Sequence, residues 1–322
     1  MNQTGAISCL LIGYSRPEKL KSQLDLLFKG NISRIYIAID GQKTANPEIT
    51  RNFETVIQNY MIKNSVEIKC WFRDKNLGTA VSIITGLDWF FKFEESGVIL
   101  EDDVLPSDDF FRFMEKSLNE VRFDDSVWLV SGNQFFPTNF ESSKNIWANY
   151  PLIWGWGTHK EKWLRMREAI LNDAIIFDVE VTPKVRNYWK TGFLRTRQSR
   201  VDSWAIPLAA QMRARNKYCL LPTVNLVTNV GIDRVASNTK LHFWTINLPT
   251  STLPDYDWIQ LSKRDIIAKE MNLLLENQVY GIKTRHRFLF LIENVLNYFK
   301  SDIPNEQGQL IARVLGVSIP DA

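Results

Sequence analysis

The chain has 322 residues, of which 45% are hydrophobic and 23% charged, which is ordinary for a soluble globular protein. Its 39 basic and 36 acidic residues give a net charge of +3, and no block of like charge indicates a nucleic-acid-binding tail. No signal-peptide pattern opens the sequence, and no apolar run has the length of a membrane span. We therefore expect a cytoplasmic protein that binds no nucleic acid. Three cysteines in apolar runs, Cys9, Cys70 and Cys219, are expected to be buried thiols in a reducing compartment.

The first half of the sequence alternates predicted strands and helices. Apolar runs predict strands at residues 6–12, 34–39, 66–72, 98–100 and 127–131. Helical periodicity predicts helices after the turn at residues 13–17 and at residues 47–64, 79–93 and 107–121. Strands that alternate with helices at this spacing imply an α/β fold with a mostly parallel sheet covered by helices on both faces.

After Gly132 this alternation ends. Residues 133–160 are rich in Asn, Phe and Trp and are predicted to form loops. The pattern then predicts helices at 159–172, 183–190 and 202–217, a strand at 218–221, and helices at 263–277 and 285–299. We expect one domain over residues 1–240, with halves 1–132 and 133–240, and a mainly helical C-terminal extension over 241–322. The extension is either a small covering subdomain or an oligomer contact.

Three adjacent carboxylates, Glu101, Asp102 and Asp103, follow a predicted buried strand. Open α/β sheets bind ligands where their strands end. Three neighbouring like charges repel one another, and a divalent cation held by one or two carboxylates, with positions left for phosphate oxygens, relieves that repulsion. The cluster therefore indicates a site for a nucleotide diphosphate. Other adjacent acids are expected on solvated helix or turn surfaces; they are Glu94-Glu95, Asp108-Asp109 and Asp124-Asp125.

Several motifs resemble, in their order, those of a GT-A glycosyltransferase, in particular N-acetylglucosaminyltransferase I and its bacterial nucleotide-diphospho-sugar transferase relatives. These motifs are Arg16 after the first strand, Ile37 to Asp40, Val98 to Asp103, Val127 to Asn133, Tyr150 to Gly157, Asp202 to Trp204, and Leu221 to Gly231. The similarity extends over roughly residues 6–240. It implies a GT-A, Rossmann-like fold and a nucleotide-diphospho-sugar as the donor, which we expect to be a UDP-sugar.

The resemblance implies roles for five residues of the donor half. Asp103 would be the direct ligand of Mn²⁺ or Mg²⁺ on the donor diphosphate, Asp102 would reach the ribose or a metal-bound water, and Glu101 would contact the sugar. Asp40 and Arg16 would hold the uracil and neighbouring groups. For these last two a structural alternative stays open, since the arginine precedes a proline in a turn and Asp-Gly is a good turn dipeptide.

Asp202 is implied as the general base of an inverting transfer, which takes a proton from the acceptor hydroxyl. Its alternative role is the N-cap of the helix that follows, since Asp is among the best capping residues. The two roles are compatible because a cap lies at the mouth of a helix.

Aromatic rings next to glycines in the loop at residues 154–157 indicate acceptor or sugar contacts. Apolar ring faces stack on the C–H faces of sugars, and a glycine such as Gly155 lets the backbone approach closely. The alternative is that the rings anchor the loop to the core, and we expect one of Trp154 and Trp156 to play each part. The resemblance adds Trp204 to the acceptor contacts.

The sequence departs from the family pattern in two places. Ala205 follows Trp204 where bacterial relatives often carry a second acid. The stretch from Ala236 to Thr239 has Asn238 where relatives tend to have a histidine. That histidine helps to bind metal or diphosphate, so its absence puts the metal affinity in doubt or transfers the role to His242.

The prediction from the sequence is a metal-dependent hexosyl- or N-acetylhexosaminyltransferase. It would transfer its sugar with inversion to a hydroxyl of a glycan or lipid-linked saccharide in surface polysaccharide biosynthesis. Peripheral contact with the inner face of a membrane through the basic, aromatic tail is compatible with such an acceptor. Two alternatives stay open. One is a sugar nucleotidyltransferase, although the loop at residues 13–17 has only one glycine, and the other is a non-catalytic nucleotide-sugar- or glycan-binding module.

Overall fold

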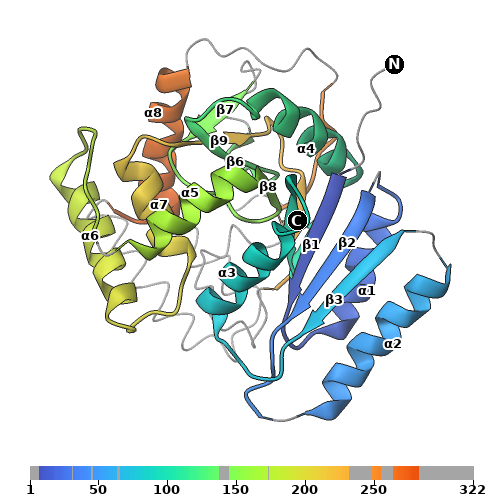
Figure 1. Cartoon of the computed structure of the whole chain (residues 1–322). Coiled ribbons are helices and arrows are strands. Elements are labelled where there is room, and N and C mark those ends of the chain that lie inside the picture. The colour runs from blue at the N-terminus through green and yellow to red at the C-terminus, as the bar shows by residue number, and fades with distance from the viewer. Residues whose placement is uncertain are drawn as a thin grey trace, which may run out of the picture.

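A computed structural model describes residues 7–30, 32–44, 46–63, 66–137, 145–172, 174–231, 248–254 and 264–282. Its centre is an eight-stranded sheet with the strand order β3-β2-β1-β4-β8-β6-β9-β7 (Figure 1). The strands are β1 (Ile7–Gly13), β2 (Ile32–Ile39), β3 (Glu67–Phe72), β4 (Ser96–Glu101), β6 (Val127–Ser131), β7 (Ile146–Ala148), β8 (Trp156–His159) and β9 (Tyr218–Leu221). Strands β8 and β7 run against their neighbours and the others share one direction, so the expected mostly parallel α/β sheet is confirmed.

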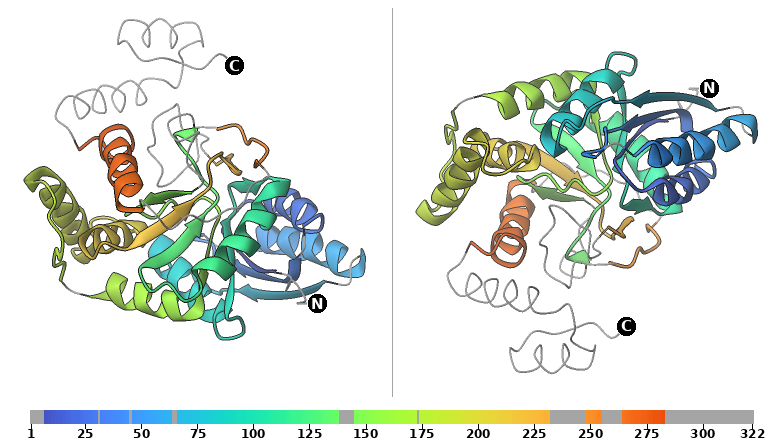
Figure 2. Two further views of the ribbon diagram at one scale, coloured as in Figure 1. Left: turned by 90° about the horizontal axis from the view of Figure 1, so that it is seen from above. Right: turned by 90° about the horizontal axis from the view of Figure 1, so that it is seen from below.

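Helices cover both faces of the sheet (Figures 1 and 2). One face packs against α1 (Pro17–Leu27), α2 (Pro47–Lys63) and α4 (Asp108–Val121), and the other against α3 (Thr79–Phe90), α5 (Lys160–Leu171), α6 (Pro183–Arg197) and α7 (Ala205–Ala214). Successive side chains of a strand point to opposite faces. In β1, Cys9 and Leu11 therefore join the α1 side while Leu10 and Ile12 join the α3 side. Both faces of the central strands are apolar because both are buried.

The predicted loop at residues 133–160 is the largest error in the expected fold. It contains β7 at the edge of the sheet and β8, which lies antiparallel between β4 and β6. Strands of three or four residues are too short to show an apolar period, and the glycine-containing sequence of β8 resembles a turn. Helix α6 is also longer than predicted and continues through Gly192, where an added Cβ atom would lie 3.1 Å from Ile206 of α7.

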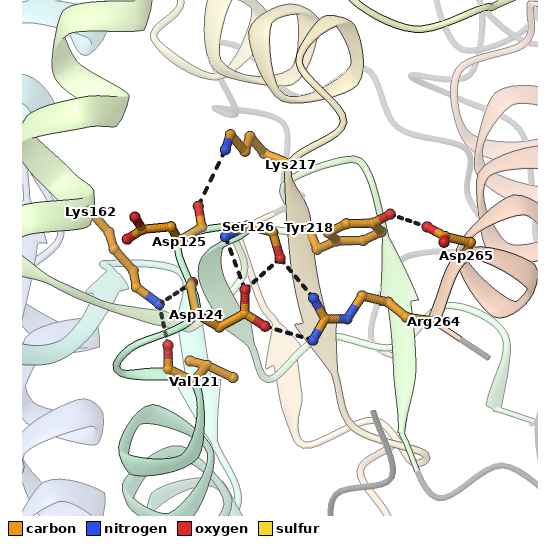
Figure 3. A network of polar contacts seen from close by, with 9 residues as sticks. All are labelled: Val121, Asp124, Asp125, Ser126, Lys162, Lys217, Tyr218, Arg264 and Asp265. Carbon is orange, nitrogen blue, oxygen red and sulfur yellow. Dashed lines mark hydrogen bonds and ion pairs between the residues drawn. The ribbon is translucent and has the colours of Figure 1, made fainter. Parts of the chain in front are cut away.

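The C-terminal region contains α8 (Arg264–Leu274), which continues into a π-helical turn, Leu275–Val279. Figure 3 shows how Arg264 ties it to the sheet, with hydrogen bonds to Asp124 at 2.6 Å and Ser126 at 2.7 Å. The Arg264 guanidinium also lies over the ring of Trp147 in the edge strand β7, at 4.4 Å. Helix α8 thus covers an edge that would otherwise expose unpaired backbone groups. The predicted helix at 285–299 lies outside the described residues, and no helix within them is long and apolar enough to cross a membrane.

The prediction that the other adjacent acids lie on solvated surfaces is wrong for Glu94, and Asp109 and Asp124 are only partly exposed because each has a partner. Glu94 is buried and accepts hydrogen bonds from Arg34 at 2.6 and 2.8 Å, Asp109 accepts the backbone N–H of Leu253 at 2.7 Å, and Asp124 is held by Arg264. In each case the partner comes from a segment far away in the sequence. All three cysteines are free, and Cys9 and Cys219 are buried as predicted, whereas Cys70 on the edge strand β3 is exposed.

Candidate functional site

The carboxyl ends of β1, β2, β3 and β4 meet along one edge of the sheet, because these strands are parallel neighbours. Asp40 follows β2, Glu101 ends β4, and Gly13 ends β1 between them. The backbone N–H of Asp40 donates to the carbonyl of Gly13 at 2.9 Å, and the backbone N–H of Tyr14 donates to the carboxylate of Asp102 at 3.3 Å. The turn after β1 therefore joins the two acidic strand ends that the sequence singled out.

Glu101, Asp102 and Asp103 are partly buried and lie side by side. Burial, followed by the neighbouring Asp103, raises the pKa of Asp102 to about 6, even though Arg16 and a backbone N–H act in the opposite direction. Burial and the other two carboxylates also raise the pKa of Glu101, and burial raises that of Asp103. Arg16 lies 3.7 Å from Asp102, as an ion pair whose side chains are each about four-fifths buried. The cluster carries more negative charge than this arginine neutralises, which suits a ligand that brings positive charge.

A two-stranded ribbon made of β5 (Val104–Pro106) and β10 (Val227–Asn229) fixes the position of Asp103. The backbone N–H of Val230 donates to the carbonyl of Asp103 at 2.8 Å, and the Asn229 side chain hydrogen-bonds its carboxylate and lowers its pKa. Asn229 also accepts the backbone N–H of Gly231 at 2.9 Å. A Cβ atom at Gly231 would lie 2.2 Å from an Asp103 carboxylate oxygen, so no larger residue fits there without displacing that carboxylate.

Asp40 holds the loop between β3 and α3. Its side chain is 6% exposed and accepts hydrogen bonds from the Asn76 amide at 3.1 Å and the backbone N–H of Leu77 at 3.2 Å. The Asn76 amide also donates to the carbonyl of Gly41 at 2.9 Å. Within the part of the chain that the structure describes, Asp40 therefore stabilises turns, and its contact with a nucleobase stays a prediction.

Asp202 lies at the N-terminus of α3 and contacts it with both carboxylate oxygens. It accepts the backbone N–H of Thr79 at 2.7 Å and that of Ala80 at 3.0 Å. Gly78 precedes them with φ +77°, and a Cβ there would lie 2.7 Å from the carboxylate. The predicted cap of the following helix is wrong, since Ser203 accepts an N–H of α7 at 3.3 Å while Asp202 caps a helix from the other half of the chain. A negative charge at this position is favourable because helix N-termini carry partial positive charge.

The tryptophans differ in burial. Trp156 in β8 is fully buried and stacks on the buried Trp204 with ring centroids 5.6 Å apart, so both rings have anchoring positions in the core. Trp154 is partly buried, with its ring edge-on to Phe135 at 5.2 Å. Gly155 between them has φ +60°, and a Cβ there would lie 2.7 Å from a side chain of β10. Acceptor or sugar contacts by these residues remain predictions. Trp154 is the tryptophan of this group whose side chain is partly exposed.

The carboxylate cluster fits a cation that is shared with a ligand. Among the described residues no group of three or more His, Cys, Asp or Glu side chains converges to hold a metal ion. Mg²⁺ and similar hard cations, however, are commonly held by one or two carboxylates together with substrate phosphates and water. Asp103, with Asp102 beside it, supplies that number of ligands. Burial raises the pKa of both carboxylates, and a bound cation would favour their ionised forms. Asn238 and His242 lie outside the described residues.

Sequence reasoning missed the residues that orient the acids. Asn76 and Gly78 received no role, although an asparagine and a glycine just before a predicted helix are a recognisable cap and turn signal. Asn229 and Gly231 belong to a motif that supported the family resemblance, but nothing local in the sequence shows that they lie against Asp103.

No protein-family model matches the chain, and no curated protein matches it. Among solved structures, the mannosyltransferase PcManGT from Pyrobaculum calidifontis in complex with GDP-Man and Mn²⁺ aligns with a TM-score of 0.38 and 12% identity over 65% of this chain and 68% of that one. Two structures of HddC from Yersinia pseudotuberculosis, one of them complexed with GMP-PN, align with TM-scores of 0.33 and 0.32 and 12% identity, over 55% of this chain and 86% of theirs. Alignments this remote carry no argument about activity, and the resemblance to N-acetylglucosaminyltransferase I stays a prediction.

Proposed function

We propose that the protein is a metal-dependent glycosyltransferase that takes a sugar from a nucleotide-diphospho-sugar, for which a UDP-sugar is our first expectation. The observation that carries the proposal is the cluster of partly buried carboxylates beside Arg16 at one edge of a parallel sheet. Asp202 binds the N-terminus of α3, and Asp40 holds the loop before that helix at the same edge. An excess of partly buried carboxylates beside an arginine suits a ligand made of a divalent cation and a diphosphate.

On the donor side, Asp103 would hold the cation, with Asp102 next to it and Glu101 toward the sugar. Bound there, a divalent cation would supply neutralisation of the charge that develops on the departing diphosphate. Arg16 is close enough to Asp102 to orient that carboxylate, and Asp40 stabilises the loop that borders the same edge. The ribbon at Asn229 and Gly231 keeps the Asp103 carboxylate in one position, which favours binding because little order is lost when the donor arrives.

On the acceptor side, Asp202 would take the proton of the acceptor hydroxyl. Each of its oxygens accepts one backbone N–H, and a carboxylate oxygen has a second lone pair with which to accept the hydroxyl. The two amide contacts orient the carboxylate at the junction of the donor and acceptor halves. Inversion follows from a single displacement in which one carboxylate acts as base, and we extend the proposal to a glycan or lipid-linked acceptor in surface polysaccharide biosynthesis.

The test is the release of free nucleoside diphosphate from a panel of nucleotide-sugars, with Mn²⁺ or with a chelator, in the absence of acceptor. We expect slow hydrolysis of one donor that chelator and Asp103→Ala abolish. Asp108→Ala is the matched control, because it removes one exposed carboxylate from the first turn of α4 and should leave the rate unchanged.

The panel also separates the alternatives. Metal-dependent nucleotide binding without release from any donor, with or without added saccharides, would favour the non-catalytic module. Formation of a nucleotide-sugar from a nucleoside triphosphate and a sugar phosphate would favour the nucleotidyltransferase. Absence of both binding and release would overturn the role given to the carboxylate cluster.

A further inference from the structure

Helix α6 and the residues that flank it form the most one-sided charge distribution in the chain. Residues 181–201 contain six basic side chains and no acidic one. These basic residues are Lys184, Arg186, Lys190, Arg195, Arg197 and Arg200. Asp178 and Glu180, both exposed, come just before this segment, and Asp202 just after it binds the N-terminus of α3.

The outward face of α6 combines these cations with exposed apolar surface. The inward face is buried through Val185, Trp189 and Phe193. On the opposite face Leu194 is 53% exposed, one turn after Lys190 and directly before Arg195, and both of these basic side chains are exposed. Cations therefore flank an exposed leucine, whereas a helix face that meets only water is expected to carry polar side chains at such a position.

The segment before α6 contacts the helix but carries the two exposed acids. Ile176 is 71% exposed, and the adjacent Phe177 lies under the guanidinium of Arg186 at 5.0 Å. Arg197 differs from the other cations because it hydrogen-bonds the carbonyls at the end of α5, where it accounts for the packing of α6. Figure 1 and both views of Figure 2 show α6 at the end of the molecule opposite α2, so the surface lies on the outside.

We propose that the outward surface of α6, defined by Lys190, Leu194, Arg195 and Arg200, docks on an anionic lipid bilayer. A bilayer surface offers negative headgroups to the cations and an apolar layer beneath them to Leu194. Lys and Arg favour that boundary because their apolar stems can lie along it. Nucleic acid would match the charge alone. A single acid-free helix with one exposed leucine gives reversible, peripheral binding that salt weakens.

Docking of this surface has a consequence for the site. Arg200 is two residues from Asp202, so the lipid surface would lie near the side of the molecule on which the acceptor enters. An acceptor carried by a lipid would then reach Asp202 without leaving the membrane. Lipid binding is nevertheless a property of α6 itself, and it stands or falls independently of the transfer reaction.

The experiment is flotation of the full chain with vesicles of phosphatidylglycerol and phosphatidylcholine mixed in equal parts, against vesicles of phosphatidylcholine alone. We expect binding to the anionic vesicles only, and its loss in 0.5 M salt. The variant K190E/R195E/R200E should bind roughly 100-fold more weakly, since each basic residue near an anionic surface contributes about fivefold. The control variant K29E/R51E/K92E changes the net charge equally at exposed positions outside α6 and should bind like the wild type.

Leu194→Asn provides a second measurement, because it keeps every charge and should weaken binding severalfold. Circular dichroism and thermal melting establish that each variant is folded. Equal loss of binding in the two triple variants would overturn the proposal, since net charge and not α6 would then be responsible. Retention by both, or vesicle binding that is indifferent to phosphatidylglycerol, would overturn it as well. So would α6-dependent binding of a single-stranded polynucleotide by a chain that ignores vesicles.

Discussion

Asp202 gives the sharpest prediction, because its capping role and its proposed catalytic role respond differently to two substitutions. Its carboxylate accepts the N–H groups of Thr79 at 2.7 Å and Ala80 at 3.0 Å. Asp202→Ala removes both acceptors, and the loss of a helix cap costs about 0.5–2 kcal/mol. Asp202→Asn keeps one acceptor oxygen and loses the charge, worth about 0.3–1 kcal/mol at a helix N-terminus. We therefore expect Asn to destabilise the protein by about half as much as Ala.

The catalytic consequence should be equal in the two variants. Neither Ala nor Asn can take a proton at neutral pH, so donor turnover should fall by about 10²–10⁴ in both. Urea unfolding gives the free energies and the nucleoside diphosphate assay gives the rates. Ser203→Ala is the matched control, because it removes a side-chain hydrogen bond to the first turn of α7 and should cost stability without affecting turnover. Turnover in Asp202→Asn within about threefold of the wild type would refute the base, and equal destabilisation by Asn and Ala would refute the hydrogen-bond account of the cap.

Three further predictions concern the supports of the fold and the site. Gly231→Ala should shift the Asp103 carboxylate, since the new Cβ would lie 2.2 Å from it, and should weaken Mn²⁺-dependent nucleotide binding by at least about tenfold in calorimetry; unchanged affinity would contradict the role of the ribbon. Arg264→Met should lower the free energy of unfolding by about 1–3 kcal/mol, because it leaves Asp124 without its charged partner, and an unchanged urea midpoint would show that α8 is held by other contacts. Burial opposes ionisation of Glu94, but hydrogen bonds from neighbouring side chains outweigh it and lower its pKa. The stabilising contribution of Glu94 should therefore be complete above about pH 5 and disappear as the pH falls through the lowered pKa. Glu94→Gln should flatten the acid limb of a plot of the free energy of unfolding against pH. Parallel plots for the variant and the wild type would disprove this account.

Much of the fold could be predicted because its signals are local. The strands at 127–131 and 218–221 have the predicted bounds, since short, fully buried and mainly apolar runs occur where the chain passes through a sheet that is covered on both faces. Helices α1 to α4 follow from apolar periodicity. By contrast, β8 forms only because β4 and β6 lie on either side of it, and no property of its four residues reveals that before the sheet is assembled.

The amino-acid sequence by itself determined the chemistry of the candidate site: which strand ends carry acids, and that Glu101 to Asp103 concentrate negative charge. The tertiary structure decided how those acids are held. Asp202 caps α3 and not its own helix, because only folding brings it to the free N–H groups of Thr79 and Ala80. Gly231 is required beside Asp103 because β10 returns to pair with β5, a contact between segments that are remote in the chain. The sequence specifies which side chain stands at each position, whereas packing between segments that are far apart in the chain decides which partner orients that side chain.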